Sequence, residues 1–393
     1  MKQQEQERKK HSMDTVRIGL VGTGGIGHHH LGYIHDLKRA ELTAVCDIRE
    51  DVVKAVAAKH NVPHFTDSRK LIRSGLVDAV LLGTPHYAHA TIGIDAANNG
   101  LHVLTEKPMA VQASMADKLV AAAKKNKVVL EVMFQRHTDP MWKKARAIIE
   151  SGALGTITRT CMIEPHFRTQ AYYDSGGWRA TWDGEGGGVM MNQAPHSLDC
   201  FVWLGGLPAK VLGKCDTRAH RIEVEDTASA LMTYPNGATG YLTTNTFEYP
   251  GTALFQFVGD RATLEIRDGK LRLGVSSPSS GEFIYSTKEA WANPVAAWTD
   301  VAVPATPHGH RYITENFVEA ILDGKPVLVT GEMAVESLEL ANAISVSSAL
   351  GKEVAIPLKR SLFDGLLQKW IRESKFRKGD LDKKKVVVPK GFA

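Results

Sequence analysis

The sequence predicts an α/β protein with two domains: a doubly wound parallel sheet, followed by an α/β domain with a large, mostly antiparallel open sheet. Its 393 residues are too many for one ordinary hydrophobic core, which indicates more than one domain. Strand-like and helix-like segments alternate up to about residue 134. Short strands separated by tight turns dominate after about residue 200.

The first part of the chain predicts six strands separated by helices. The expected strands cover residues 16–21, 42–46, the neighbourhood of 65, 77–82, 101–104 and 128–134, and the expected helices include 51–59, 88–98 and 114–125. Because parallel neighbours need crossover connections, this order predicts a single parallel, doubly wound sheet.

The pattern changes after Pro140. A helix over residues 141–150 is followed by strands over 209–215, 227–234, 238–246, 252–258 and 262–267, and by helices over 312–322 and 332–350. Asn236-Gly237 and Asp268-Gly269 are tight-turn dipeptides beside these strands, which is typical of antiparallel pairing.

These changes divide the chain into four segments. We expect a disordered tail over residues 1–14, a first domain over 15–138, a second domain over 139–358 and an extension over 359–393. The net charge of +5 is small for this length, and much of it lies in the two end segments. We therefore expect no binding to nucleic acid.

Cysteine usage and the N-terminus predict a cytoplasmic protein. The four cysteines are widely spaced and form no CxxC pair, which argues against a disulfide framework or a zinc site. The first 14 residues are polar and lack the apolar core of a signal peptide. No apolar run approaches the roughly 20 residues of a membrane helix, so we expect no membrane partner.

A glycine-rich loop directly follows the first expected strand and begins a helix. It consists of Gly22, Thr23, Gly24, Gly25, Ile26 and Gly27. In such a loop Gly22 permits the tight turn, Gly24 lets the backbone approach a pyrophosphate, and Gly27 lets helix and strand pack closely. The helix N-terminus offers amide N–H groups to the phosphates. The loop is the fingerprint of a Rossmann dinucleotide-binding domain.

An acidic residue after the second strand favours NAD as the cofactor. Asp47 stands 20 residues after Gly27, where a carboxylate binds the 2′-hydroxyl of the adenosine ribose and repels a 2′-phosphate. Arg49 keeps NADP an alternative, since its guanidinium can pair with a 2′-phosphate. Ile48, between them, belongs to the same expected site.

The histidines do not predict a metal site. His28, His29 and His30 follow the glycines, but successive helical positions point about 100° apart and cannot converge on one ion. We expect them at the surface or at the edge of the cofactor. His308 and His310 flank a glycine, where we expect a loop. We therefore predict no bound metal.

Further motifs follow one another over roughly residues 15–358. They are the glycine loop, Gly83-Thr84-Pro85 with His89, Glu106-Lys107-Pro108 directly after the fifth strand, and Gly186-Gly187-Gly188 leading into Asn192, His196 and Asp199. In their joint order and spacing they resemble the Gfo/Idh/MocA family, the group of glucose–fructose oxidoreductase and inositol dehydrogenase. The segment from Arg168 to Arg179 also resembles the aromatic stretch before the triple glycine in many members.

The resemblance implies an NAD(P)-dependent oxidoreductase of sugars, cyclitols, glycosides or nucleotide sugars. It also implies association through the outer face of the second sheet, so we expect a homodimer or homotetramer. Besides the residues named above, the expected cofactor residues are Thr84, Pro85, His86, His89, Glu106, Lys107 and Gln135.

The expected catalytic residues are Lys107, His196 and Asn192. Alcohol oxidation needs a proton acceptor, and positive charge near the developing alkoxide. Lys107 follows a parallel strand, at the edge where doubly wound sheets bind ligands. His196 titrates near neutrality and can accept the proton. The spacing of Asn192, His196 and Asp199 predicts one face of a helix.

Asn192 departs from the commonest family pattern, in which an aspartate stands at this position. An amide hydrogen-bonds a substrate hydroxyl but accepts no proton. Because of this departure, we expect His196 and Lys107 to carry out proton transfer. It also argues against simply assigning the activity of the inositol dehydrogenases to this chain.

Residues 164–183 combine aromatic and charged side chains, as carbohydrate sites do. Domain packing is the alternative explanation for part of this set. The substrate residues that we expect are Lys107, Arg136, His166, Arg168, Tyr172, Trp178, Arg179, Asn192 and His196.

Three functions are compatible with these motifs. The leading one is an NAD(P)-dependent dehydrogenase of a pyranose, cyclitol or glycoside, with oxidation at C3 of a glycoside as one version. The second is a redox-neutral glycosidase or epimerase that oxidises and then reduces its substrate with retained NAD. The third is a non-catalytic dinucleotide-binding regulator. Lys107 and His196 argue against the third, because a sensor needs neither.

Overall fold

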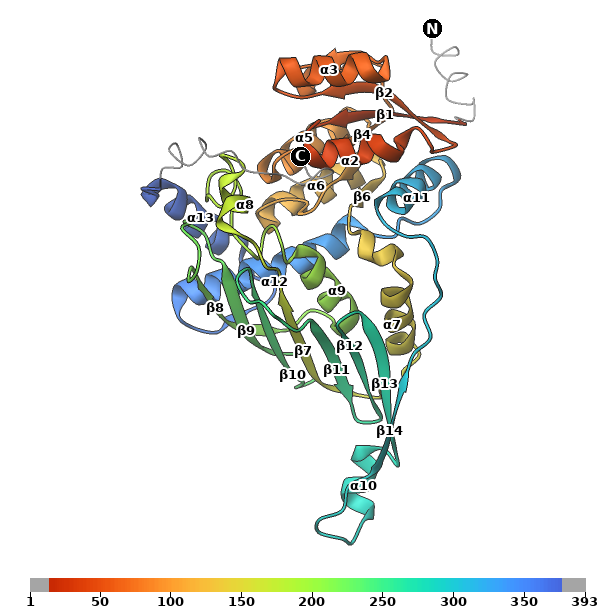
Figure 1. Cartoon of the computed structure of the whole chain (residues 1–393), viewed down its shortest axis with the longest axis vertical. Helices are drawn as coiled ribbons and strands as arrows, with labels where there is room; N and C mark the ends of the chain where they lie inside the picture. Colours follow the sequence, from red (N-terminus) through yellow and green to blue (C-terminus); the bar gives the residue numbers. More distant parts are fainter. Residues whose placement is uncertain (1–13, 377–393) are drawn as a thin grey trace.

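Two sheets organise the computed structural model, which describes residues 14–376 (Figure 1). The first sheet has the order β3-β2-β1-β4-β5-β6, and every neighbouring pair is parallel. Its strands are β1 (Val16–Val21), β2 (Ala40–Cys46), β3 (His64–Phe65), β4 (Ala79–Leu82), β5 (His102–Thr105) and β6 (Leu130–Val132). The predicted doubly wound parallel sheet is confirmed. The tail that we expect to be disordered lies outside the described residues, apart from Asp14, as does the extension after residue 376.

Helices connect these strands, and local sequence explains where they begin and end. They are α2 (Gly25–Ile34), α3 (Glu50–His60), α4 (Ser68–Ile72), α5 (His86–Asn98) and α6 (Ala113–Asn126). The Asp67 carboxylate caps α4 by accepting a hydrogen bond from Arg69 N at 2.9 Å. Asn61 and Lys127 adopt left-handed φ angles of 53° and 55° directly after α3 and α6, which is a common way to end a helix.

The second sheet has the order β14-β13-β12-β11-β7-β10-β9-β8-β15. Its strands are β7 (Ile157–Pro165), β8 (Lys210–Asp216), β9 (Thr227–Thr233), β10 (Thr239–Asn245), β11 (Leu254–Gly259), β12 (Ala262–Arg267), β13 (Lys270–Ser277), β14 (Val295–Asp300) and β15 (Val354–Ala355). β7 and β10 pair in parallel and the other neighbours are antiparallel, which confirms the mostly antiparallel sheet. The sequence prediction did not include β7, β13, β14 or β15.

The remaining helices pack around the second sheet and join it to the first. They are η1 (Gln135–Thr138), α7 (Pro140–Glu150), α8 (Gln170–Asp174), α9 (Pro195–Gly205), α10 (Ser280–Ser286), α11 (His310–Asp323), α12 (Gly331–Leu350) and α13 (Arg360–Glu373). α12 lies between the two sheets (Figure 1), where it packs against β8, α9 and α6. Among residues 14–376, no helix combines the length and apolar character needed to cross a membrane.

α13, which lies in the predicted extension, contacts both halves of the chain. Arg360 binds Asp117 of α6 and Glu339 of α12. The ring of Trp370 stacks on Trp182, with the centroids 4.5 Å apart. The extension therefore packs against the loop that holds Trp178 and Arg179.

The carboxyl ends of β1, β4 and β5 bring three loops side by side. Gly83 N donates to Val21 O at 2.8 Å, and Glu106 N donates to Leu82 O at 2.9 Å. The glycine loop, the Thr84 segment and the Glu106-Lys107 pair therefore meet where the strand order reverses, which is where open α/β sheets bind ligands.

Candidate active site

The glycines of the first loop have different steric roles. Gly22 has a φ of +94°, and a Cβ there would lie 2.5 Å from Gly83 O. A Cβ on Gly27 would lie 2.2 Å from Gly22 O, so the helix approaches β1 only because no side chain intervenes. At Gly24, by contrast, no heavy atom of the described chain lies within 4 Å of the Cβ position. The loop therefore leaves open space at Gly24, directly before the N-terminus of α2.

Asp47 lies beside this loop, directly after β2. Its Oδ2 accepts hydrogen bonds from Thr23 N at 2.9 Å and Thr23 Oγ1 at 3.0 Å, and its Oδ1 accepts from Arg49 N at 3.0 Å. Burial acts to raise the pKa of Asp47, but these hydrogen bonds outweigh it and the pKa is lowered. Ile48 is 89% exposed. An ionised carboxylate and an apolar surface thus flank the glycine loop.

Two buried polar atoms near the loops fit a bound dinucleotide. Thr84 Oγ1 and Gln135 Oε1 have no hydrogen-bond partner among residues 14–376. Buried polar atoms normally have one, so a polar ligand is the expected partner. The His89 ring contacts Thr84 O at 2.6 Å and Pro108 O at 2.8 Å, and so it ties the loop after β4 to the loop after β5. The residues present therefore fit a nicotinamide dinucleotide.

Lys107 extends from the loop after β5 to the segment before α9. Its Nζ donates a hydrogen bond to Asn192 O at 3.0 Å. Burial lowers the pKa of Lys107, and the nearby carboxylates of Glu106 and Glu185 oppose this effect. The ammonium thus connects the parallel sheet to the second half of the chain.

Glu106 belongs to a buried hydrogen-bond network. Its Oε1 lies 2.9 Å from His30 Nε2, and the other ring nitrogen of His30 lies 2.5 Å from the Tyr33 hydroxyl. Burial acts to raise the pKa of Glu106, but the hydrogen bond and charge of His30 dominate and the pKa falls to about 2. Tyr33 in turn contacts Thr314 Oγ1 at 2.9 Å, so the network reaches α11.

The sequence predicts the three histidines at the surface or at the cofactor edge. A surface position is wrong for His30, which is buried and hydrogen-bonded to Glu106. The expected loop at His310 is also wrong, since α11 begins there. The ring of His310 lies 4.6 Å from that of His29 and 5.8 Å from that of His30. In the described part of the chain, no three His, Cys, Asp or Glu side chains are arranged to hold a metal ion.

His196 lies in the first turn of α9. Its Nδ1 is buried and has no hydrogen-bond partner within residues 14–376. Burial, followed by the charge of Lys107, holds the pKa of His196 well below its ordinary value of 6.5. The imidazole is therefore neutral at neutral pH. The charge of Lys107 thus acts on the His196 ring, and the Asn192 carbonyl binds the lysine.

The expectation that Asn192, His196 and Asp199 share one helix face is wrong. α9 begins at Pro195, and proline favours the first helical position, so Asn192 lies in the turn before the helix. Asp199 Oδ2 lies 2.7 Å from His137 Nε2. Asp199 therefore anchors η1.

Arg136 and His166 lie in a polar cluster near His196. The Arg136 guanidinium pairs with Glu164 at 3.1 Å and lies 3.5 Å from Ser197 Oγ. The ring of His166 lies 3.3 Å from the same hydroxyl, and burial lowers the pKa of His166 to about 4. The charges of Arg136 and His166 both act to lower the pKa of His196, which places this cluster close to its ring.

Two guanidinium groups lie over the ring of Tyr172 in cation–π contacts. The Cζ atoms of Arg168 and Arg179 lie 5.1 and 4.6 Å from its centroid, and Arg179 also donates to the Tyr172 hydroxyl at 2.8 Å. Arg179 lies 4.7 Å from the ring of Trp178 as well. Both arginines act to lower the pKa of Lys107. The aromatic platform that they form with Tyr172 and Trp178 therefore lies within electrostatic reach of the ammonium.

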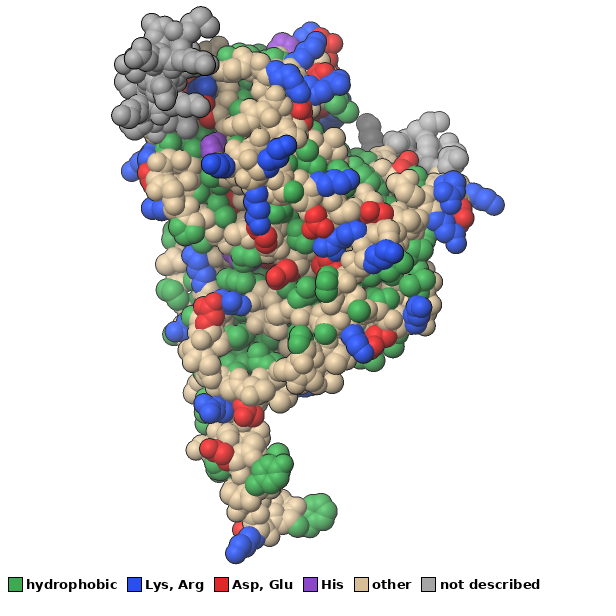
Figure 2. Space-filling model, turned by 180° about the vertical axis from the view of Figure 1, so that it is seen from behind, with side chains coloured by type: hydrophobic (Ala, Val, Ile, Leu, Met, Phe, Trp, Pro, Cys, Tyr) green, Lys and Arg blue, Asp and Glu red, His purple; other side chains and the backbone are tan. Residues whose placement is uncertain are grey.

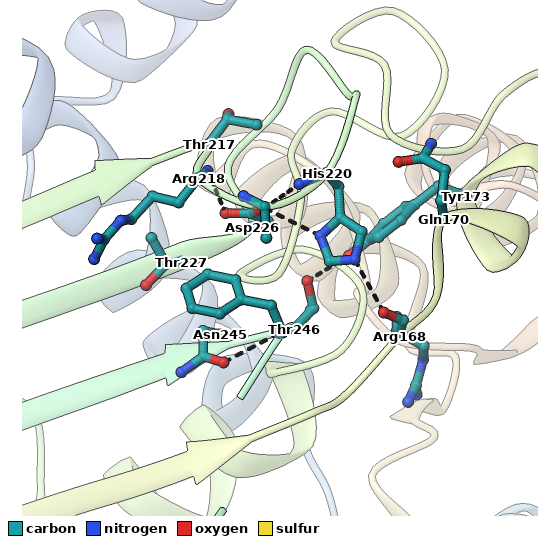
Figure 3. A network of polar contacts seen from close by, with 12 residues as sticks. Arg168, Gln170, Tyr173, Thr217, Arg218, His220, Asp226, Thr227, Asn245 and Thr246 are labelled. Atoms are coloured by element: carbon teal, nitrogen blue, oxygen red, sulfur yellow. Dashed lines mark hydrogen bonds and ion pairs between the residues drawn. The ribbon is translucent and has the colours of Figure 1, made fainter. Parts of the chain in front are cut away.

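Figure 3 shows how the backbone at Arg168 is held. The His220 ring lies between two acceptors, Arg168 O at 2.9 Å and Asp226 Oδ2 at 3.0 Å. The Asp226 carboxylate also accepts hydrogen bonds from the backbone N–H groups of Arg218, Ala219 and His220 at 2.8–2.9 Å. This network fixes the backbone at Arg168, whose side chain lies over Tyr172, and the sequence motifs did not indicate it.

Family models match both halves of the chain. A model described as an oxidoreductase family with an NAD-binding Rossmann fold matches residues 16–134, and a GFO/IDH/MocA C-terminal domain model matches residues 142–265. Together they span more than half of the chain. The chain belongs to the Gfo/Idh/MocA family. It is therefore an NAD(P)-dependent oxidoreductase, as the motifs predict.

Relatives of known name agree with this family. The rhizopine catabolism protein MocA of Rhizobium meliloti is 27% identical over 336 residues, which cover 84% of this chain and 94% of that protein. The inositol 2-dehydrogenase of Rubrobacter xylanophilus is 28% identical over 265 residues, 64% of this chain and 72% of that protein. A crystal structure of the WlbA dehydrogenase from Bordetella pertussis, in complex with NADH and UDP-GlcNAcA, is 28% identical with a TM-score of 0.75 and covers 88% of this chain and 100% of that one.

This member of the Gfo/Idh/MocA family has a buried carboxylate at the site that sequence reasoning missed. Glu185 is 1% exposed, and its Oε1 accepts a hydrogen bond from the Asn192 side-chain amide. Glu185 directly precedes the triple glycine. Gly188 of that motif packs so closely on the backbone of Glu225 that a Cβ would lie 1.8 Å from Glu225 O. The position of Glu185 before a tightly packed motif was the available signal.

Proposed function

We propose that the protein oxidises a secondary alcohol of a sugar, cyclitol or glycoside, with C3 of a glycoside as one version of the reacting carbon. The observation that carries the proposal is that the Lys107 ammonium lies within electrostatic reach of the neutral His196 imidazole, whose Nδ1 has no partner in the described chain. One relative is named for inositol and another was crystallised with UDP-GlcNAcA, and both support a substrate with ring hydroxyls.

The two groups divide the work of alcohol oxidation. Lys107 donates a hydrogen bond to the reacting oxygen and stabilises the negative charge that develops there. His196 accepts the hydroxyl proton, which a neutral imidazole can do. When bound at the glycine loop, NAD would supply the hydride acceptor, and the loss of one hydride from carbon and one proton from oxygen would leave a ketone. The guanidinium groups of Arg168 and Arg179, held over the Tyr172 ring, offer donors for sugar hydroxyls.

A lysine variant tests this proposal. We expect Lys107→Ala to lose NADH formation by about 10²-fold or more across sugars, cyclitols and glycosides, because the alkoxide loses its nearest charge. Binding of NADH, followed by its fluorescence, should persist. Lys118→Ala, which changes an exposed lysine on α6, is the matched control. Unchanged turnover in Lys107→Ala would contradict the proposal, and product without net NADH would indicate the redox-neutral route.

We also propose that the protein forms a homodimer or homotetramer through the second sheet. Leu212, Leu231 and Tyr241 are 40–58% exposed on neighbouring strands of this sheet, which is unusual for large apolar side chains that stand together.

A further inference from the structure

The Lys107 ammonium depends on carboxylates that do not touch it. Within residues 14–376 its Nζ forms no ion pair, and its hydrogen bond goes to Asn192 O. Among the charged side chains that act on it, Glu106 and Glu185 favour the ammonium, whereas Arg179 and Arg168 oppose it. Glu106 is already bound by His30. Glu185 is therefore the second source of negative charge for this lysine.

Glu185 also determines how the Asn192 side chain is oriented. A carboxylate only accepts hydrogen bonds, so the Asn192 amide must present its NH₂ group to Glu185 Oε1. The amide oxygen Oδ1 then points away from Glu185, and within the described residues it has no partner. An amide oxygen is an acceptor for a hydroxyl hydrogen. The same residue binds Lys107 through its backbone carbonyl, so Asn192 connects the carboxylate to the ammonium.

The other oxygen of Glu185 has a structural contact. Oε2 accepts a hydrogen bond from Ala180 N at 2.6 Å, and Ala180 has a left-handed φ of 54°. This conformation costs an alanine roughly 1 kcal/mol. A purely structural role for Glu185, which would hold this loop in place, is therefore the alternative that an experiment must separate.

We propose that Glu185 is a positioning residue of the oxidation: it orients the Asn192 amide so that Oδ1 accepts a substrate hydroxyl, and its negative charge stabilises the Lys107 ammonium. In the commonest family pattern an aspartate at position 192 carries both the charge and the hydroxyl-binding atom. In this chain the charge lies on Glu185 and the hydroxyl-binding atom lies on Asn192. This inference rests on the proposed function, because it assigns Asn192 Oδ1 to the substrate that Lys107 and His196 oxidise.

The first test exchanges the two side chains. We expect Glu185→Gln to reduce kcat by about 10-fold or more, and Asn192→Asp to do the same because it places two carboxylates in contact. The double variant Glu185→Gln/Asn192→Asp keeps one carboxylate and one amide in the same pair, so it should recover most of the loss. A double variant no faster than the slower single variant, with a wild-type melting temperature, would overturn the proposal.

The second test separates positioning from loop stability. Ala180→Gly removes the strain at φ 54°, so Glu185→Gln is also made in that background. We expect Ala180→Gly to restore the melting temperature of Glu185→Gln but not its rate. Recovery of both together would mean that Glu185 only holds the loop, and the proposal would be wrong.

A third measurement does not need turnover. The reactivity of Lys107 toward an amine-acylating reagent is followed against pH by mass spectrometry of its peptide. We expect the midpoint to fall by about one pH unit in Glu185→Gln, because the ammonium loses a nearby negative charge. An unchanged midpoint would overturn the proposed charge effect. If the wild-type protein oxidises no polyol while this shift is present, the proposed function fails but the charge effect does not.

Discussion

Lys107 and His196 are both partly buried, and the loss of solvent around them determines which protonation state each adopts. Burial lowers the pKa of Lys107 from 10.5 and holds that of His196 well below 6.5. For alcohol oxidation the lysine must be charged and the histidine neutral. We therefore expect kcat/KM to stay level as the pH falls through 6.5 and to decline on the alkaline side before pH 10.5. An acid limb with its midpoint near the ordinary histidine value would contradict a buried, neutral His196.

Glu131 on β6 links stability to pH through a single carboxyl group. Its Oε1 accepts hydrogen bonds from Leu328 N at 3.1 Å and Val329 N at 3.4 Å, whereas Oε2 has no partner among residues 14–376. Burial raises its pKa to about 8 from 4.5, so the folded state binds the proton more tightly than the unfolded state. The stability from this group is present below pH 4.5 and is lost as the pH rises to about 8, by up to about 1.4 kcal/mol per pH unit.

Replacing this carboxyl with an amide should remove that loss. At pH 9 we expect the free energy of unfolding of Glu131→Gln to exceed that of the wild type by a few kcal/mol, so the variant should unfold at a higher urea concentration. At pH 4.5 the two proteins should differ little. Glu41→Gln, at an exposed position of β2, is the matched control. A Glu131→Gln variant that is equally destabilised at both pH values would show that the carboxyl is ionised in the folded protein.

At the scale of the elements, Gly24 and Gly188 have opposite steric surroundings, so an added methyl group should affect cofactor binding at the first and stability at the second. Gly24 has open space at its Cβ position and an ordinary φ of −73°, whereas a Cβ on Gly188 would collide with Glu225 O. We expect Gly24→Ala to keep its melting temperature and to bind NADH about 10-fold more weakly, because the methyl group occupies the space for the pyrophosphate. We expect Gly188→Ala to unfold at lower temperature by several degrees or to aggregate. Equal stability of the two variants would contradict this steric difference.

The same scale shows why the sequence predicts some elements and misses others. Helices and the parallel strands are recognisable because their periodicity and glycine motifs are local. β7 was missed because its middle residues, Thr160, Cys161 and Met162, are all buried and show no apolar–polar alternation. The start of α9 was placed too early because the spacing 192/196/199 fits a helix, whereas Pro195 begins it.

The sequence likewise predicts some residues of the candidate site and misses others. Lys107, His196 and Asp47 stand in motifs, so their types and spacing identify them. His30 acts through Glu106, which lies 76 residues away in the sequence, so no local pattern reveals that contact. Glu185 binds Asn192 and the loop at Ala180, where φ is left-handed, and its position before the triple glycine was the one signal along the chain.

At the scale of the whole molecule, the second sheet leaves surfaces uncovered. β13 and β14 extend into an arm that carries α10, and Figure 2 shows hydrophobic side chains standing out from it at the narrow end of the molecule. Tyr285 and Trp291 of this arm are 89% and 96% exposed. Over the face in Figure 2, acidic and basic side chains are interspersed.

Cross-strand register places an apolar row on the outer face of that sheet. Leu212 pairs with Leu231, Leu231 with Tyr241, and Tyr241 with Cys161, and directly paired residues point to the same side. A second copy of the chain is the occupant that we propose for this row. A charge at its centre would then be buried without a partner, which costs several kcal/mol per interface.

We therefore expect Leu231→Asp to shift the protein from an oligomer to a 42.9 kDa monomer in size-exclusion chromatography with light scattering. The matched control is Leu350→Asp, which introduces the same charge at an exposed leucine at the end of α12. This control should keep the wild-type mass, because Leu350 lies outside the row. A monomeric wild type would contradict association through this sheet, as would an unchanged mass for Leu231→Asp. If both variants dissociated, the charge itself and not its place in the row would be responsible, since only one of the two positions belongs to the proposed interface.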